Sequence, residues 1–526
     1  MNSRNNLFSS ITIIGLILFI ASSLFTKQQP FFLMLTAAQL IFVPVILQLI
    51  IKIKRLHRFI IFTGMVSIFI LHIISSSTWS VILALVYVAF TLFVAVLGAK
   101  RFLRRGFVNW AEISIDIGMM YLFVGGLWFF SYIAGVNTGF SPLITWLTGI
   151  HFHYSAFLLC ISLGLFGRLH DSKLYRWIVP MILSGPILVA IGITFWPILE
   201  VISVLMYIFA IYILVVLAFQ THFVTRIQAV CIRLSFSALA VTIIFSFLYA
   251  LGNAFGEWII RIDFMLAFHG FFNCIIFGLL GVVGWAMSPP KTKQLSWDFP
   301  ISQVRGKLIV TDDSNHPGLV DDLSAFVDTK ALPKTIIEFY EQTDRYQLVA
   351  SIKWATWFKP FAMCYKSISK QMQQLNLPIS SKETEMTGEI KKIDTRVDGR
   401  VKPRAWIRKV GEQTAFVAIY SQHNTAGRTY MNIALPLPYS SMIGILQLEE
   451  IEGQLILTSE GSGDEGIYLA AGKFLFKLPL SEHFTIIETH KGHLTALHKM
   501  KIFGIPFLRI DYRIIEKSGN GPEDVG

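Results

Sequence analysis

Histidines, carboxylates and other polar side chains stand at the ends of apolar stretches in this 526-residue chain, where ionisable groups are costly and so become functional candidates. A His-x-His pair, His151 and His153, is the densest of these positions. Imidazoles near a carboxylate can bind a transition metal such as zinc, iron or copper, or can exchange protons. The whole candidate cluster, all of it at one side of the apolar stretches, consists of His72, His151, His153, Tyr154, Glu200, Asp263, His269 and Asn273.

Three uses of this cluster stay open. The same residue types join helices by hydrogen bonds, each worth under about 1–2 kcal/mol. They can also form a path for transport or proton exchange, or a metal site made by His151, His153 and His269. The His-x-His spacing gains force as a metal signal only where His269 or Glu200 converges on it in space. We predict no cofactor, with a transition metal as the alternative.

Two carboxylates stand at the opposite side of the same stretches. Glu112 and Asp116 are four residues apart, which places them on one face of a helix. One interpretation is an ion pair at the level of the lipid headgroups, with Arg104 or Arg105 as the partner. The other is a proton or cation relay, because neighbouring carboxylates can share a proton.

The elements that must position these residues are apolar stretches long enough to cross a bilayer, which takes about 20 residues. The chain is 54% hydrophobic and only 15% charged, with a mean hydropathy of +0.59, whereas soluble domains are about a quarter charged. This composition excludes a disordered chain and a simple soluble enzyme. Ten stretches qualify: 7–25, 31–51, 59–75, 79–99, 111–134, 152–168, 177–195, 198–219, 229–251 and 264–287.

Basic residues alternate between the connections of these stretches. Residues 1–290 hold 16 Lys or Arg against 6 Asp or Glu. Of these 16 basic residues, 14 lie on the side of the membrane to which the N-terminus and the even-numbered connections would belong. Because cytoplasmic loops carry the basic excess, we predict a cell-membrane protein with both termini in the cytoplasm. The net charge of +12 then follows from the orientation of the helices in the membrane, and we predict no nucleic-acid partner. The expected partners are membrane lipids and a small-molecule or ion substrate.

The composition changes after Pro289 and Pro290, and four segments are predicted. The ten-helix region is 1–288, a linker is 289–331, a cytoplasmic β-rich domain with leading helices is 332–516, and a flexible tail is 517–526. A helical period runs over 332–369, and from residue 385 the apolar period drops to two. The predicted fold is therefore an α-helical polytopic membrane bundle followed by an α+β domain, dominated by an antiparallel sheet or half-open barrel.

An aromatic segment precedes the predicted strands. Trp354, Trp357, Phe358 and Phe361 are flanked by lysines, which fits a segment in the headgroup region and equally a face packed on the sheet. A curved sheet around an apolar helix can also enclose a small ligand, and a lipid-like one would suit a membrane protein.

The glycine-rich and catalytic motifs of common enzyme classes are missing from the sequence. It has no Walker loop, dinucleotide fingerprint, zincin helix or nucleophile elbow, and its four cysteines form no disulfide or metal spacing. The sequence therefore favours a protein that is not an enzyme.

The run Gly149–Phe157, with the sequence GIHFHYSAF, resembles the YndJ-like family of Bacillus-type membrane proteins. The run 268–273, FHGFFN, is similar to that family as well, and the resemblance covers roughly residues 1–290. It implies a ten-helix membrane region, with 375–378 and the β-rich part resembling a domain fused behind it. The family is functionally uncharacterised and sometimes labelled a transporter, so the resemblance implies no catalytic residues.

Three functions follow from these observations. The first is a transporter or permease-like bundle with a cytoplasmic regulatory or ligand-binding domain, favoured by the helix break at Ser184–Pro186. The alternatives are a membrane-embedded metalloenzyme near the outer leaflet and a lipid- or partner-binding membrane sensor.

Overall fold

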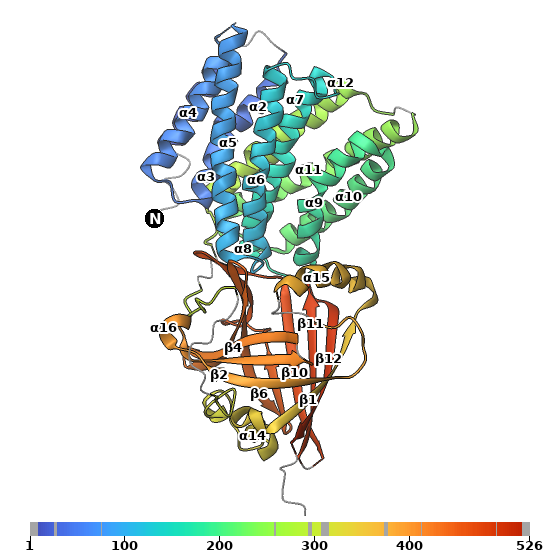
Figure 1. Ribbon diagram of the computed structural model, residues 1–526. Helices are drawn as coiled ribbons and strands as arrows, with labels where there is room; N and C mark the ends of the chain where they lie inside the picture. Colours follow the sequence, from blue (N-terminus) through green and yellow to red (C-terminus); the bar gives the residue numbers. More distant parts are fainter. Residues whose placement is uncertain are drawn as a thin grey trace, which may run out of the picture. The chain divides into compact units, whose positions relative to one another are not determined.

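The computed structural model describes residues 9–25, 29–74, 76–256, 259–292, 297–306, 315–372, 377–411, 413–490 and 492–517. The chain divides into two compact units. The helical unit consists of Met1–Phe102 and Asn109–Gln294, and the barrel unit consists of Leu103–Val108 and Leu295–Gly526 (Figure 1). Nearly all of the predicted tail, 518–526, lies outside the described residues, as do 293–296 and 307–314 of the predicted linker.

Apolar helices make up the helical unit, and each of the ten predicted stretches coincides with one of them. Some are built from several segments that follow one another without a break. The helices are α1 (Ser10–Phe25), α2–η2–α3 (Phe32–Ala37, Ala38–Phe42, Val43–Ile50), α4 (Arg55–Leu71), α5 (Ser77–Arg105), α6 (Trp110–Ile133), α7–η3–α8 (Pro142–His151, Phe152–Leu158, Leu159–Leu169), α9 (Lys173–Phe195), α10 (Pro197–Gln220), α11 (Arg226–Phe255) and α12–η4–η5–α13 (Ile262–Phe264, Met265–Gly270, Asn273–Leu279, Leu280–Met287).

Eight of these helices, within the described residues, are long and apolar enough to cross a membrane. The helical bundle is confirmed, but the prediction that all ten reach membrane-spanning length needs a correction. Helix α1 has 16 residues and α4 has 17. The sixth predicted stretch, by contrast, was too short. Its helix begins at Pro142, because the Ser141 side chain caps the Ile144 amide and proline is well suited to the first helical turn.

Four π-helical segments interrupt these helices. They are η2, η3, η4 and η5, and π-helix is otherwise rare and frequently found at functional sites. Segment η2 contacts η3 and η5, while η5 also contacts η3 and η4. The four segments therefore meet inside the helical unit, and we call this meeting place the π junction.

The barrel unit is a closed ring of ten antiparallel strands. The ring order is β5-β4-β3-β2-β1-β12-β11-β10-β7-β6, and β6 pairs back onto β5. The strands are β1 (Tyr346–Trp354), β2 (Thr384–Lys392), β3 (Val401–Val410), β4 (Gln413–Thr425), β5 (Arg428–Leu437), β6 (Ser440–Ile451), β7 (Gln454–Thr458), β10 (Leu480–His490), β11 (His493–Ile502) and β12 (Ile505–Glu516); β8 (Gly466–Ala471) and β9 (Phe474–Lys477) extend the sheet from β6. The predicted antiparallel sheet is confirmed, and it closes completely instead of remaining half open.

Two helices lie at opposite ends of this barrel (Figure 1). They are α14 (Lys334–Glu341) and α15 (Lys359–Met372), with short helical turns at η6 (Leu323–Ala325), η7 (Thr343–Arg345), η8 (Thr356–Phe358) and α16 (Thr395–Asp398). The predicted helical period over 332–369 is wrong in its middle, where β1 runs instead. Alternate residues of β1 are buried, which is the pattern of a strand facing a core.

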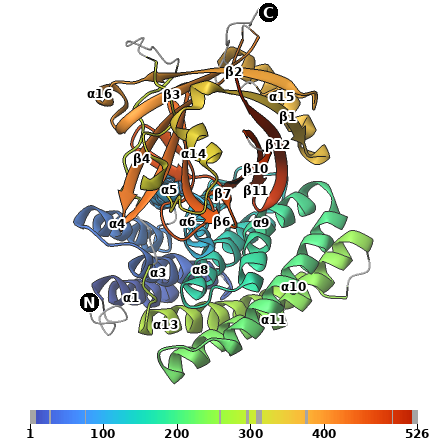
Figure 2. The same cartoon turned by 90° about the horizontal axis from the view of Figure 1, so that it is seen from below.

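Each face of the sheet packs against its own apolar core. Inward side chains such as Leu348, Trp406 and Ile510 join Ile336 and Phe339 of α14, around which the strands curve (Figure 2). Outward side chains of β3, β4, β5, β6 and β8 form a second core, which is covered by Phe299 and Val304 of the segment before the barrel. Its strand residues are Ala405, Ile419, Tyr430, Ala434, Ile443, Ile445, Tyr468 and Ala470. The alternation of apolar residues on both faces is what holds the register of the ring.

Truncating the aromatic plug of α14 should destabilise the barrel. Phe339 is 4% exposed and packs edge-on against Tyr340 and Tyr346. Phe339→Ala should cost about 3–5 kcal/mol of unfolding free energy, since it leaves a cavity in the inner core. Hydrogen exchange at the barrel strands of the full chain measures this loss. Phe361→Ala, at a side chain that is 62% exposed, is the control, and equal losses in the two variants would contradict the plug role.

Candidate functional site

The π junction carries polar side chains on each of its four segments. Segment η3 holds His153 and Tyr154, η4 holds His269, and η5 holds Asn273, four of the residues that the sequence singled out. It also holds Gln39 on η2, which sequence reasoning missed because a lone glutamine in an apolar stretch carries no motif. Polar groups therefore concentrate where the helical backbone departs from the α form.

His153 is fixed through both ring nitrogens. Its Nδ1 donates to the Gly149 carbonyl at 2.8 Å, and its Nε2 accepts from the Tyr87 hydroxyl at 2.8 Å. Both rings are fully buried and stack nearly parallel. Gly125 of α6 allows this arrangement, because a Cβ there would lie 2.8 Å from His153 Nδ1. His153 is thus a helix-joining residue with no nitrogen left for a metal.

His269 belongs to a three-residue hydrogen-bonded triangle. Its Nδ1 donates to the Thr242 carbonyl at 3.2 Å, and its Nε2 accepts from the Asn273 amide at 3.1 Å. The Thr242 hydroxyl in turn donates to Asn273 Oδ1 at 2.9 Å. The triangle joins η4, η5 and α11, and it sets the orientation of the His269 ring.

His151 is the neighbour of this triangle. The imidazoles of His151 and His269 are close enough to interact electrostatically. His151 Nδ1 donates to the Leu147 carbonyl at 2.7 Å, and within the described residues its Nε2 makes no hydrogen bond. The side chain of His151 is exposed at the surface of the helical unit and that of His269 is partly exposed. The structure therefore brings together His151, His269 and Asn273.

The other members of the predicted cluster lie in separate contacts. His72 Nε2 meets the Thr36 hydroxyl at 3.2 Å, and Glu200 accepts from the Asn253 amide at 2.7 Å. The Tyr154 hydroxyl donates to the Met34 carbonyl and lies 3.1 Å from the Cys274 thiol, while Asp263 is exposed. Across the described ranges, three or more His, Cys, Asp or Glu side chains nowhere meet closely enough to hold a metal ion.

The predicted carboxylate pair lies in a buried ion cluster. Arg168 of α8 binds Glu112 with two hydrogen bonds, Nε to Oε1 at 2.7 Å and Nη2 to Oε2 at 3.0 Å. Arg101 of α5 lies 3.0 Å from Glu112 and 2.8 Å from Asp116. The Thr292 hydroxyl donates to Glu112 as well. Two guanidinium groups thus balance two carboxylates that are each no more than 3% exposed.

The partners predicted for this pair need a correction. The expected residues were Arg104 or Arg105 at the end of α5, whereas the ion pairs are to Arg101 and Arg168. The carboxylates are buried inside the unit, so they meet a residue one turn farther into α5 and an arginine of α8. The cluster ties α5, α6 and α8 together, which is the structural use of such a pair.

The aromatic segment before α15 divides between its two predicted roles. Trp354 and Phe358 stack on each other and pack against the inner core of the barrel, with Phe358 4.7 Å from Phe507 between ring centroids. Trp357 is 45% exposed and Phe361 is 62% exposed. Core packing therefore accounts for two of the four residues, and contact with lipid headgroups stays a prediction for the other two.

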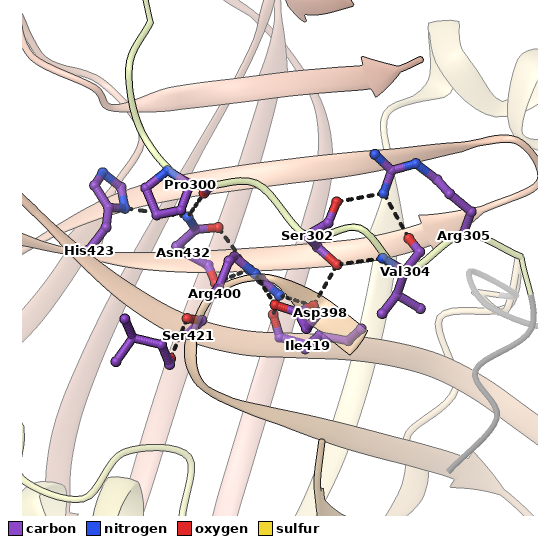
Figure 3. A network of polar contacts seen from close by, with 11 residues as sticks. Pro300, Ser302, Val304, Arg305, Asp398, Arg400, Ile419, Ser421, His423 and Asn432 are labelled. Carbon is purple, nitrogen blue, oxygen red and sulfur yellow. Dashed lines mark hydrogen bonds and ion pairs between the residues drawn. The ribbon is translucent and has the colours of Figure 1, made fainter. Parts of the chain in front are cut away.

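A second buried polar network anchors the segment before the barrel (Figure 3). Arg400 binds both oxygens of Asp398, and its Nη1 donates to the carbonyl and side chain of Asn432. The Ser302 hydroxyl donates to Asp398 at 2.6 Å, and the Asn432 amide reaches the Nδ1 of His423 at 3.3 Å. Because both charges are fully buried and bonded on several sides, this network is structural.

Comparison with known proteins identifies the family. The chain is 38% identical over 453 residues to "Uncharacterized membrane protein YndJ" of Bacillus subtilis (strain 168), covering 82% of this chain and 83% of that protein. The chain belongs to the YndJ-like family. The family's sequence model, described as YndJ-like protein, matches residues 33–277, so the YndJ-like region coincides with most of the helical unit. No solved structure matches.

Loss of one charge from the ion cluster of this YndJ-like protein should be costly. Glu112→Gln leaves Arg168 buried beside a neutral amide, and about 3–5 kcal/mol of stability should be lost. Thermal unfolding of the purified full chain measures it. The control is Asp171→Asn, which breaks an ion pair whose side chains are 57% and 46% exposed and should cost under about 1 kcal/mol. The double variant Glu112→Leu/Arg168→Met should recover part of the loss, and an unaltered Glu112→Gln protein would contradict the cluster's role.

The barrel should lose stability as the pH falls. Burial lowers the pKa of His423 below its ordinary value of 6.5, although the hydrogen bond to Asp464 opposes this and Arg400 adds to it. The unfolded chain then binds more protons than the folded one, so the contribution is complete above pH 6.5 and is lost as the pH falls below it. Hydrogen exchange at β4 and β5 between pH 7.5 and 5.5 measures the effect. His423→Gln should flatten this pH dependence, and His493→Gln, at an exposed position, should not. The same pH profile in both variants would contradict the assignment of the pH dependence to His423.

Proposed function

We propose that the protein is a membrane transporter that moves protons, with or without a coupled solute, through the π junction of its helical unit. The observation that carries the proposal is the pair His151 and His269, which combines exposure at the surface of the helical unit, mutual proximity and one nitrogen, His151 Nε2, that makes no hydrogen bond within the described residues. Imidazole is the side chain whose proton affinity lies nearest to physiological pH.

The surroundings of this pair favour proton movement over mere helix contact. Asn273 and Thr242 hold His269 in one orientation, while His151 Nε2 makes no hydrogen bond within the described residues. Ionisable groups within membrane helices mark proton relays and substrate paths. The π-helical backbone supports the same proposal, because such turns recur where helices carry a function.

The proposed orientation places the Glu112 cluster toward the cytoplasm and the His151 pair toward the outside. Its support is the distribution of Lys and Arg over the even-numbered connections. Both termini, and with them the barrel unit, are then cytoplasmic. Proton passage between the two sides would run from the π junction toward the cytoplasmic ends of α5, α6 and α8.

Proteoliposomes test the proposal directly. With a pH-sensitive dye inside and a valinomycin-driven potassium potential, the purified protein should acidify the lumen faster than protein-free vesicles. His151→Ala should reduce the rate at least about tenfold, as expected when an essential proton carrier is removed, and His269→Ala should reduce it as well because it removes the ring on which the charge of His151 acts. His72→Ala, a histidine held by Thr36 outside the pair, should retain the rate and serves as the matched control. Vesicles no faster than protein-free ones, or histidine variants equal to the wild type, would refute proton transport.

A further inference from the structure

The inward face of the barrel changes character along its axis. Near α14 it is aliphatic, with Leu348, Leu455 and Leu494 packed on the plug. Farther along, Ile352 of β1 and Ile510 of β12 stay aliphatic and buried, whereas polar and aromatic side chains make up part of the lining. Their inward direction follows from pairing: Arg408 lies two residues beyond the inward Trp406, and Tyr512 pairs with the inward Ala350.

Arg408 is a buried cation among aromatic rings. It is 8% exposed, and its guanidinium lies 4.4 Å from the ring centroid of Trp406 and 4.0 Å from that of Phe416. The Tyr512 side chain lies close enough to interact with it electrostatically. These contacts hold the side chain inside the ring and fix where its charge lies.

This guanidinium lacks the counter-charge that burial demands. In the part of the chain that the structure describes, no carboxylate lies within ion-pairing distance of Arg408, and its buried Nε has no hydrogen-bond partner. The nearby carboxylate of Glu482 is engaged by His498 at 3.2 Å. A buried charge without a partner carries a large desolvation cost, which a bound anion would remove.

The side chains along the axis near Arg408 are not fully packed. Tyr420, Phe484, Met500 and Tyr512 face the inside of a closed ring, yet each keeps part of its surface accessible. One side of each of these side chains packs against the inner core, and the rest of its surface stays accessible. Aromatic rings and a thioether therefore remain available for contact with an apolar chain.

We propose that the barrel binds an amphipathic anion, with one carboxylate or phosphate group at Arg408 and Tyr512 and an aliphatic chain along Tyr420, Phe484 and Met500. Arginine suits this role because its planar fork matches a carboxylate or phosphate with two hydrogen bonds. The barrel is then a binding module for a lipid-like molecule. This site is independent of proton transport through the helical unit, and either can fail without the other.

Binding of a dansyl-labelled undecanoic acid to the full chain in nanodiscs tests the site, with empty nanodiscs as the blank. The wild type should give saturable fluorescence above that blank. Laurate and dodecyl phosphate are each tested as competitors of the probe. The stronger competitor shows whether the ligand is a fatty acid or a phosphorylated lipid. Dodecanol, which has the chain without the charge, should compete at least about tenfold more weakly, the factor that one charge-assisted contact supplies. Dodecanol equal to both anions would overturn the proposal without any variant.

Two substitutions assign the binding to the inside of the barrel. Arg408→Gln should weaken the probe at least about tenfold, and Arg408→Lys less, because lysine keeps the charge and loses the fork. Arg513→Gln is the matched control, since this arginine lies on the outward face of β12 with a side chain that is 57% exposed. Tyr512→Phe, which keeps the ring, should weaken binding if Arg408→Gln fails to fold. Wild-type affinity in Arg408→Gln and Tyr512→Phe, or no saturable binding by the wild type, would refute the site.

Discussion

A guanidinium group taken out of water must find a negative partner, and this constraint organises both units of the protein. Arg168 meets Glu112 with two hydrogen bonds in the helical unit, and Arg400 meets Asp398 in the same way in the barrel unit. The first pair joins α6 to α8. Arg400 and Asp398 are only two residues apart, and the Ser302 hydroxyl, which donates to Asp398, joins them to the segment before the barrel. Arg408 breaks this pattern among the described residues, which is why its surroundings point to a ligand while those of the other two point to structure.

The helical unit meets a related constraint for its uncharged polar groups. Inside a membrane protein, each hydroxyl, amide and imidazole has to be satisfied by a neighbouring helix. Tyr87 does this for His153, and Thr242 with Asn273 does it for His269. These contacts lie on or beside π-helical turns, so the departures from α-helix and the polar pairs occur together. The backbone irregularity is where helices can accept side chains from one another.

The sequence predicts the helices well because their signal is local. A stretch of some 20 apolar residues decides a helix without reference to the rest of the chain, and alternation does the same for a strand. Partner choice is different, since it depends on which helices pack together. Arg101 and Arg168 bind the carboxylates although Arg104 and Arg105 are equally plausible by composition. For the same reason the sequence does not predict that β5 pairs with β6 and closes the barrel. It also does not predict that Trp354 packs against the inner core while Trp357 is exposed.

The hydrogen bonds of the candidate histidines separate rings that are held at both nitrogens from one that is held at a single nitrogen. His153 and His269 in the helical unit and His423 in the barrel use both ring nitrogens, one as donor and the other as acceptor, so each is held as a neutral ring in one tautomer. A histidine bound in this way cannot take a proton without losing the hydrogen bond at its accepting nitrogen. His151 has its donor fixed by the Leu147 carbonyl while its Nε2 makes no hydrogen bond within the described residues, so protonation there breaks no hydrogen bond among them. The charge gained would then act on His269 nearby, which makes the pair the place where a proton changes the helical unit at least cost.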